Sequence, residues 1–493
     1  MRCSKTFSYL FFLFAFACAQ QGIYVELNSS DKGPIVEKSS QYFSLSIEWD
    51  LIQGYLANKT EFEPATTQLL SNLKALSGSA PVLRIGGNSA DYSEWNPNHE
   101  RPYSSHVTYN ITLDDLKGLK SIATQLKTKL ILGLNFLNPI DPSRSLKEAE
   151  AIVETIGEDL IQSFEIGNEP DLYKNNGVRP KTFTFKQYTS QFLVYAKSLR
   201  DQEITSGIHV QGGAWAGLDQ DKYAGFMKMT SDWCDDYSFH AYPLTSCNDK
   251  HPTVQQLLQD SHGQAVIRSH RFLTKAAAQL KTTLTLGETN SVSCQGYGSV
   301  SDTFGAALWA LDWTMNTVYT HFSGLYWHSH KGAPYNFVQY DGERAVAKPL
   351  YYAMYFYSLF AGRSYTLSSP NVITSNEKVK TWCIKDNENG TPRCLFIHKD
   401  LNATQPINVT LSWYQADLPK VDTEFIQLAT LKGNSPFNGE TVTAAGVTFD
   451  GEGKPQGEPQ WTRVVASRRR NIISFNFEIR PTTAVIAATL PVQ

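Results

Sequence analysis

Eight short apolar segments alternate with helical segments between residues 43 and 360. The helical segments repeat apolar residues at a period near 3.6, as Leu69, Leu70, Leu73 and Leu76 do in the first of them. Eight consecutive strand–helix units favour a closed (β/α)8 TIM barrel over an open sheet. No glycine-rich phosphate-binding motif follows any expected strand, which removes the usual reason to expect a nucleotide-binding sheet. The expected strands span residues 43–49, 81–88, 129–136, 161–169, 209–215, 237–243, 284–289 and 324–330.

Short strand-like segments separated by turn residues replace the helical period after Gly362. This pattern is typical of an antiparallel β-sandwich. We therefore expect an α/β protein with a barrel over residues 43–361 and a C-terminal β-sandwich domain over residues 362–493. The sandwich strands are expected at residues 378–384, 393–398, 407–413, 424–431, 441–449 and 471–479.

The first nineteen residues have the pattern of a signal peptide. Arg2 and Lys5 precede an apolar run over residues 10–16, and Ala17 and Ala19 provide a small-x-small cleavage site. The run is too short to span a bilayer. We expect a secreted, extracellular glycoprotein with no membrane contact after cleavage. Six Asn-x-Ser/Thr sequons fit this route, at Asn28, Asn58, Asn110, Asn389, Asn402 and Asn408.

The charge distribution gives no electrostatic reason to expect a nucleic-acid partner. The chain has 44 basic and 47 acidic residues, a net charge of -3, and no long block of one sign. Its 26 Phe, 24 Tyr and 10 Trp residues suit a large core and also the walls of carbohydrate clefts. No sequence feature indicates an oligomeric state.

The cysteines predict two disulfides and no metal site. Cys383 and Cys394 flank a hairpin turn at residues 387–390, so they are expected to face each other across two strands. Cys247 and Cys294 each follow an expected barrel strand and form the second predicted pair, which leaves Cys234 free and buried. No C-x-x-C motif or His/Cys cluster is present, so we expect neither a metal nor another cofactor.

Two glutamates close expected barrel strands, Glu169 on the fourth and Glu288 on the seventh. The C-terminal ends of barrel strands converge on one active site, so the two carboxyl groups are expected to face a single cleft. Glycoside hydrolysis uses two such carboxyl groups: one protonates the leaving oxygen and the other attacks the anomeric carbon. A single glutamate at a strand end is as often structural, but the pair favours catalysis.

Four motifs resemble glycoside hydrolase family 79, the family of β-glucuronidases and heparanases. The resemblance implies a retaining mechanism with Glu169 as acid/base and Glu288 as nucleophile, whose carboxyl groups would lie about 5 to 5.5 Å apart. It also implies that the N-terminal segment, residues 20–42, pairs with the β-sandwich. The motifs are LRIGGN at 83–88, FEIGNEPD at 164–171, HAY at 240–242 and LGET at 286–289.

The resemblance also implies ligands for the sugar. Asn168 is expected to bind the sugar 2-hydroxyl. Asn88 and Glu48 are expected to bind other ring hydroxyls, although the family usually has Asp where this chain has Glu48. The uronate carboxylate is expected to contact three tyrosines that lie on or after strands six, seven and eight, namely Tyr242, Tyr297 and Tyr335.

Three further polar residues are expected to lie near Glu169 and Glu288 without contacting the substrate. Arg84 and His240 are expected to orient the two glutamates rather than to touch substrate. Glu165 shares the inward parity of Glu169 but lies deeper, so a structural ion pair is its expected role.

Three functions are compatible with these residues. The leading one is a secreted exo-β-glucuronidase that releases terminal glucuronic acid, free or 4-O-methylated, from glycans. A heparanase-like endo-enzyme would need clustered Lys and Arg around the cleft, and the relevant loops carry few. An inactive carbohydrate-binding protein on the same fold has no need for both Glu169 and Glu288.

Overall fold

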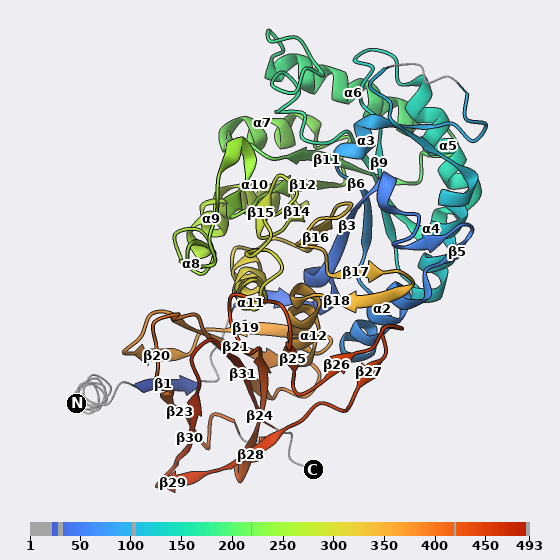
Figure 1. The fold of residues 1–493 in the computed structure, drawn as a ribbon. Coiled ribbons are helices and arrows are strands. Elements are labelled where there is room, and N and C mark those ends of the chain that lie inside the picture. Colours follow the sequence, from blue (N-terminus) through green and yellow to red (C-terminus); the bar gives the residue numbers. More distant parts are fainter. Residues whose placement is uncertain (1–21, 28–32, 101–104, 218, 419–420, 490–493) are drawn as a thin grey trace.

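The computed structural model describes residues 22–27, 33–100, 105–217, 219–418 and 421–489. The expected signal peptide and the sequon at Asn28 lie outside these residues. Figure 1 shows two parts, a barrel surrounded by helices and a region of two β-sheets beside it. Within the described residues, no helix combines the length and apolar character needed to cross a bilayer.

The eight expected strands form one closed parallel barrel, which confirms the predicted fold class. Each pairs with its sequence neighbours, and the last pairs with the first. The strands are almost entirely buried because helices cover the outside and side chains fill the inside. In chain order they are β3 (Ser44–Glu48), β6 (Leu83–Gly86), β9 (Leu130–Leu134), β10 (Ile161–Ile166), β11 (His209–Trp215), β12 (Asp236–His240), β14 (Thr283–Thr289) and β16 (Leu325–Ser329).

The outer helices begin where the sequence places capping residues. Thr112 and Asp115 form a reciprocal capping box at the start of one helix, and Thr184 and Gln187 form another. The helices that connect barrel strands, or follow the last one, are α2 (Pro64–Ser77), α4 (Leu113–Leu126), α5 (Ser143–Ile156), α6 (Phe185–Asp201), α7 (Gln220–Thr230), α8 (Val254–Leu257), α9 (Gln264–Ser269), α10 (Arg271–Gln279), α11 (Phe304–Tyr319) and α12 (Pro349–Ala361). The loops also contain a short helix, α3 (Asn88–Tyr92), and four two-stranded pairs. These pairs are β4 (Ala57–Asn58) with β5 (Glu61–Phe62), β7 (Ser93–Trp95) with β8 (Tyr109–Ile111), β13 (Leu244–Thr245) with β15 (Val292–Ser293), and β17 (Val338–Asp341) with β18 (Arg344–Ala347).

Helices α11 and α12 are buried nearly all round. They pack against each other and against strands of the sandwich, so a second layer covers the faces that would otherwise meet solvent. A helix that is apolar on all sides must be enclosed in this way.

Two sheets pack face to face in the C-terminal region. One has the order β20-β1-β23-β30-β29, and the other runs β2-β19-β21-β22-β31-β24-β25 with β28 beside β24. Ile23, Val409 and Phe475 of the first sheet share a core with Phe396 and Ile426 of the second. The strands are β1 (Gly22–Leu27), β2 (Ile35–Val36), β19 (Tyr365–Ser368), β20 (Asn371–Thr374), β21 (Val379–Asp386), β22 (Pro392–His398), β23 (Ile407–Tyr414), β24 (Phe425–Lys432), β25 (Thr443–Ala444), β28 (Thr462–Val465), β29 (Ser467–Arg469), β30 (Ile472–Ile479) and β31 (Ala484–Ala488).

The N-terminal strand β1 lies between β20 and β23 (Figure 1). It runs antiparallel to β20 but parallel to β23. The β1–β23 pair therefore differs from the other strand pairs of the sandwich, which are antiparallel. A parallel neighbour needs a long connection, and here the whole barrel supplies it.

The expected strand over residues 441–449 is wrong. A tight turn interrupts it, with Ala445 and Gly446 both at positive φ (52° and 81°) and the Val447 amide donating to the Ala444 carbonyl at 2.9 Å. Only β25 and the short β26 (Thr448–Phe449), which pairs with β27 (Pro455–Gln456), remain.

Both predicted disulfides are present, between Cys247 and Cys294 and between Cys383 and Cys394. Cys234 is free and buried. Four of the described sequon asparagines, at Asn58, Asn389, Asn402 and Asn408, are exposed, and Asn110 is half-buried.

A buried ion cluster joins the sandwich to the barrel. The ammonium of Lys399, just after β22, lies 2.6 Å from Asp312 of α11 and 3.1 Å from Asp260, which follows α8. The indole of Trp382 donates to the other Asp312 oxygen at 3.0 Å. Lys399 and Asp312 are both nearly inaccessible, with side chains 4% and 3% exposed.

We expect Lys399→Met to lower the free energy of unfolding by about 3 to 5 kcal/mol, because it leaves the buried Asp312 carboxylate without its counter-charge. Urea unfolding followed by tryptophan fluorescence measures the change. The matched control is Lys378→Met, which removes a pair with Asp400 whose lysine is 58% exposed, and should cost less than about 1 kcal/mol. Equal costs for the two variants would contradict a structural role for the cluster.

Candidate active site

A cavity of about 940 Å³ opens at the C-terminal ends of the barrel strands. Its wall includes Glu169, His240 and Glu288, from the fourth, sixth and seventh strand units. Asn88, His328 and Tyr335 complete the side formed by the second and eighth units. The cavity therefore holds both glutamates that the sequence singles out.

The loop after β10 presents Glu169 in an unusual backbone conformation. Glu169 has a φ of 47°, and Gly167 two residues earlier has a φ of 72°. A β-carbon at Gly167 would lie 2.5 Å from the Tyr173 hydroxyl oxygen, so only glycine fits there. The amide of Glu169 donates to the carbonyl of Ala214 at 2.9 Å, which ties this strained residue to the next strand.

Asp91 anchors the same loop from below, a role that the sequence analysis missed. Its carboxylate accepts hydrogen bonds from the amides of Asn168 (3.1 Å) and Phe136 (2.8 Å) and from the Tyr173 hydroxyl (2.6 Å). Asp91 sits in the short helix α3, outside any periodic pattern, so no local signal could have identified it.

Glu288 lies near the end of β14 and receives two donors. The guanidinium of Arg84 donates to one carboxylate oxygen at 3.0 Å, and the hydroxyl of Tyr242 donates to the other at 2.9 Å. Arg84 also donates to Glu165 at 2.8 Å and to the Asn168 side-chain oxygen at 2.9 Å. One buried guanidinium therefore orients Glu288, and Glu165 is its structural ion-pair partner.

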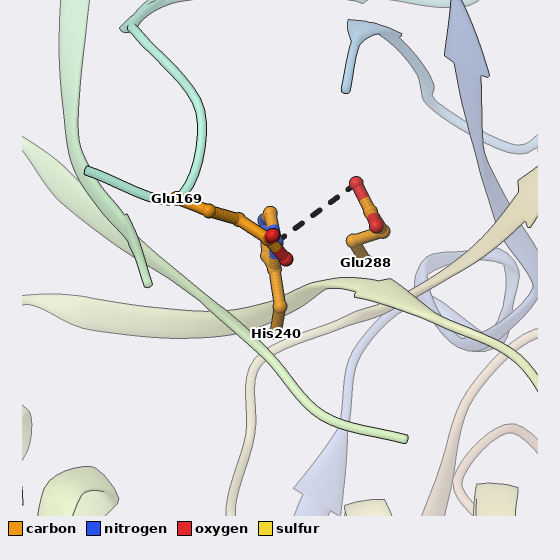
Figure 2. A group of neighbouring side chains, drawn as sticks. All are labelled: Glu169, His240 and Glu288. Atoms are coloured by element: carbon orange, nitrogen blue, oxygen red, sulfur yellow. Dashed lines mark hydrogen bonds and ion pairs between the residues drawn. The ribbon is translucent and has the colours of Figure 1, made fainter. Parts of the chain in front are cut away.

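The two glutamates face each other across His240 (Figure 2). Nδ1 of His240 lies 3.0 Å from Oε1 of Glu169 and 3.9 Å from Oε2 of Glu288. One ligand atom from each of the three residues lies within 4.8 Å of the others. The nearest oxygens of the two carboxyl groups are thus closer than the roughly 6.5 to 9.5 Å by which carboxyl groups are separated when a water molecule must fit between them, which favours direct attack by the second carboxylate.

The two carboxyl groups differ in proton affinity. Burial, reinforced by the negative charge of Glu288, raises the pKa of Glu169 to about 8. Burial would also raise the pKa of Glu288, but the charges of His328 and Arg84 and the Tyr242 hydroxyl hold that pKa far below its usual range. The site thus holds one protonated and one ionised carboxyl group near neutral pH.

Two histidines complete this electrostatic arrangement. Burial lowers the pKa of His240 to about 4, so a neutral imidazole contacts Glu169. Burial alone would lower the pKa of His328 too, but the carboxylates of Glu288 and Glu48 together raise it. His328 lies 3.8 Å from Glu288 and 3.4 Å from Glu48.

The sequence analysis missed His328, although a signal existed. His328 is the next-to-last residue of the eighth strand, β16. It is a polar residue next to the apolar, buried residues that begin this strand. A search for polar residues at every strand end, rather than for carboxylates alone, would have found it.

Glu48, an expected ring-hydroxyl ligand, does not belong to the described cavity wall. Its carboxylate accepts from the amides of Asn88 (3.2 Å) and Ser89 (2.7 Å) and from the Ser89 hydroxyl, and it is 1% exposed. A β-carbon at Gly87 would come within 2.5 Å of this carboxylate. The structure therefore places Glu48 beneath the loop after β6, where it positions Asn88 and His328 instead of meeting the cavity.

Asn88 and Asn168 form a connected pair. The amide nitrogen of Asn168 donates to the side-chain oxygen of Asn88 at 3.3 Å, while its oxygen faces Arg84. Asn88 lines the cavity, and Asn168 is buried beside it with 4% exposure.

The three tyrosines do not converge on one point. Tyr242 and Tyr335 both line the cavity. The Tyr242 hydroxyl donates to Glu288, whereas the Tyr335 hydroxyl has no hydrogen bond to any described residue. Tyr297 is not among the described residues that line the cavity, and its hydroxyl lies 3.0 Å from Nδ1 of His251. Two of the three expected carboxylate ligands, Tyr242 and Tyr335, therefore share the cavity, and Tyr297 lies outside its described wall.

Glu169, His240 and Glu288 offer atoms close enough to ligate a cation. However, both oxygens of Glu288 already accept from Arg84 and Tyr242, and the guanidinium places a fixed positive charge beside them. The cluster is therefore suited to proton transfer rather than to metal binding.

Two relatives match part of the chain by sequence. A protein named beta-glucuronidase from Neurospora crassa is 24% identical in an alignment of 353 residues that covers 64% of this chain and 62% of that protein. One of the same name from Aspergillus niger is 24% identical in an alignment of 327 residues that covers 61% of this chain and 60% of that protein. The match thus spans less than two thirds of either relative's own length. No protein-family profile matches the sequence.

Solved structures share the fold. The crystal structure of a 4-O-α-L-rhamnosyl-β-D-glucuronidase from Fusarium oxysporum 12S has a TM-score of 0.75 at 18% identity and covers 94% of this chain and 100% of its own. A family 51 α-L-arabinofuranosidase from Bifidobacterium longum has a TM-score of 0.66 at 13% identity, with 96% of this chain and 100% of its own covered. At these identities the likeness shows a common barrel-and-sandwich architecture.

Proposed function

We propose that this protein is a retaining exo-β-glucuronidase that releases terminal glucuronic acid, free or 4-O-methylated, from glycans. The observation that carries the proposal is the pair Glu169 and Glu288, which lie close together in one cavity with pKa values shifted in opposite directions. The names of the two sequence relatives and of the rhamnosyl-glucuronidase structure support glucuronic acid as the sugar.

The first step of the proposed reaction forms a bond to the enzyme. The ionised Glu288 attacks the anomeric carbon while the protonated Glu169 gives its proton to the leaving oxygen, so the glycosidic bond breaks and a glucuronyl ester forms. Arg84 and Tyr242 hold the attacking carboxylate in place, and His240 holds Glu169.

The second step returns the enzyme to its starting state. Glu169, now ionised, takes a proton from a water molecule, which attacks the anomeric carbon and displaces Glu288. Two inversions give net retention, so the first product is the β-anomer. His240 does not take up the proton that moves between Glu169 and water, because burial lowers the pKa of its imidazole to about 4.

The expected signal peptide and the exposed sequons support secretion of the enzyme. Two disulfides fit an oxidising compartment.

The alternatives fit less well. A heparanase-like endo-enzyme would need several cations for a sulfated chain, but the described cavity wall carries one lysine, Lys250, and no arginine. An inactive carbohydrate-binding protein would have no use for the opposite protonation of Glu169 and Glu288.

A release assay tests the proposal. Purified protein is compared on p-nitrophenyl β-glucuronide, β-glucoside and β-xyloside, with proton NMR of the first product. We expect the highest kcat/KM on the glucuronide and a β-anomer at early times. Preference for either neutral sugar would overturn the assignment of the sugar, and an early α-anomer would overturn the retaining mechanism.

We expect Tyr335→Phe to lower kcat/KM for p-nitrophenyl β-glucuronide by about 10-fold more than for the glucoside. The Tyr335 hydroxyl is free to donate to the uronate carboxylate, and a hydrogen bond to a charged group is worth about 1.5 to 3 kcal/mol. Tyr242→Phe is the matched control: it removes a donor to Glu288, so both substrates should lose similar activity. Equal losses in Tyr335→Phe would indicate that Tyr335 only packs.

A further inference from the structure

The cavity has a buried floor and a solvent-facing mouth. Glu288, His240 and Tyr335 at the floor are 5%, 1% and 3% exposed. The loop after β12 forms one side of the mouth, where Lys250 and His251 are exposed and still line the same cavity. A volume of about 940 Å³ is at the upper end of ligand pockets, so there is room for more than one sugar unit.

The acid/base side of the site faces the mouth. The side chain of Glu169 is 16% exposed, whereas that of Glu288 is 7% exposed. Since Glu169 protonates the leaving oxygen, a terminal sugar bound at the floor points its leaving group outward. The units beyond the scissile bond therefore pass the loop after β12.

Lys250 is the one lysine or arginine in the described cavity wall, and Asp249, which precedes it in the loop, does not belong to that wall. Apart from Glu169 and Glu288, no carboxylate belongs to the described cavity wall. Lys250 forms no ion pair with any residue that the structure describes, and His251 is held by the Tyr297 hydroxyl at 3.0 Å. We call the group Lys250, His251, Gln256 and His262 the mouth wall; all four line the cavity.

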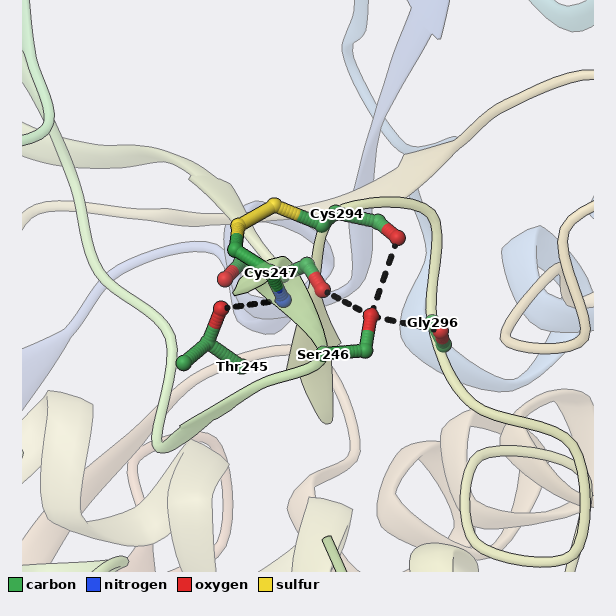
Figure 3. The surroundings of a disulfide bond; sticks show 6 residues. Thr245, Ser246, Cys247, Cys294 and Gly296 are labelled. Atoms are coloured by element: carbon green, nitrogen blue, oxygen red, sulfur yellow. Dashed lines mark hydrogen bonds between the residues drawn. A yellow bond between two sulfur atoms is a disulfide. The ribbon is translucent and has the colours of Figure 1, made fainter. Parts of the chain in front are cut away.

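The mouth wall is anchored at both ends. At one end, the Cys247–Cys294 disulfide joins the loops after the sixth and seventh barrel strands (Figure 3). Ser246 reinforces this joint, with its hydroxyl within 3.0 to 3.1 Å of the carbonyl oxygens of Ser293, Cys294 and Gly296.

At the other end, Asp260 lies within ion-pair distance of Lys380 and Lys399 of the sandwich. This residue falls between Gln256 and His262, so the sandwich supports the part of the chain that carries them. A wall fixed in advance loses little conformational entropy when it binds a ligand.

We propose that the mouth wall is a subsite for a carboxylate carried by the leaving-group part of the glycan, with Lys250 as its charged ligand. This inference rests on the proposed glucuronidase function and narrows it to acidic oligosaccharides. One ammonium flanked by imidazole and side-chain amide groups matches a single carboxylate, whereas a polysulfated chain would need more cations.

The test compares two disaccharides, glucuronosyl-β-galactose and glucuronosyl-β-galacturonate, alongside p-nitrophenyl β-glucuronide. We expect the wild-type kcat/KM to be about 10-fold higher for the galacturonate disaccharide, and Lys250→Met to remove that preference, since one charge-assisted hydrogen bond accounts for such a factor. Lys250→Arg should retain most of it. The preference should also shrink between 0.05 and 0.5 M salt, because the mouth is exposed and its charges are screened.

The matched control is Lys331→Met, which removes an exposed lysine that is outside the cavity wall and should leave the preference unchanged. A wild-type enzyme that cleaves the p-nitrophenyl glucuronide but shows no acidic preference would overturn this inference alone. A preference that survives in Lys250→Met would also overturn it. Failure to cleave any glucuronide would instead overturn the proposed function.

Discussion

Replacing Glu288 with Gln is expected to lower kcat by roughly 10⁵-fold or more on every glucuronide, whatever its leaving group. The amide is nearly the same shape as the carboxylate but cannot form the covalent intermediate. Arg84 and Tyr242 both donate to this side chain, so the variant also loses the negative charge that they are arranged to hold. Stopped assays with long incubation measure the residual rate.

Two controls accompany the Glu288→Gln variant. Glu154→Gln changes an exposed glutamate on α5 and should keep full activity. Circular dichroism should show the same fold for all three proteins. Residual activity within 100-fold of the wild type would reject Glu288 as the nucleophile.

Replacing Glu169 with Ala should produce losses that depend on the leaving group. We expect a fall of about 10³- to 10⁴-fold on an oligosaccharide, which needs protonation, and a much smaller effect on formation of the glucuronyl-enzyme from p-nitrophenyl glucuronide. Azide fits the space of the missing side chain and needs no base, so it should restore turnover and yield β-glucuronyl azide. Uniform losses, or the absence of azide rescue, would reject the acid/base role.

The same variant should change the pH profile. In the wild type, kcat/KM needs Glu169 protonated, so it should fall as pH rises through the pKa that burial and Glu288 raise to about 8. Glu288 stays ionised to well below the usual carboxyl range, so the acidic limb should lie at low pH. Glu169→Ala should lose the alkaline limb. An unchanged alkaline limb would assign that titration to another group.

Local patterns were sufficient for much of the fold. The alternation of strands and helices predicted the barrel, because period and capping depend on residues within a few positions of each other. The hairpin at Cys383 and Cys394 was predictable for the same reason. The strand over residues 441–449 was mispredicted because Ala445 has a left-handed backbone conformation, which an alanine in the sequence does not indicate.

The site was predictable only in part. Barrel geometry brings all strand ends together, so Glu169 and Glu288 could be expected in one cavity from their positions alone. The contacts of Glu48, Asp91 and His328 could not be predicted from the sequence, because each contact joins residues from different strand units. Whether a polar side chain faces a ligand or a buried neighbour depends on packing that no sequence period encodes.

The amino-acid sequence by itself determined the barrel, the disulfides and the two candidate carboxyl groups, since these follow from periodicity, spacing and the convergence of strand ends. Only the tertiary structure decided their different protonation. Glu169 and Glu288 have the same side chain and line the same cavity, yet Arg84, Tyr242 and His328 surround Glu288, whereas Glu169 lies beside a neutral imidazole. The pKa of a buried group depends on the charges and donors within a few ångströms, and folding chooses those neighbours from distant parts of the chain.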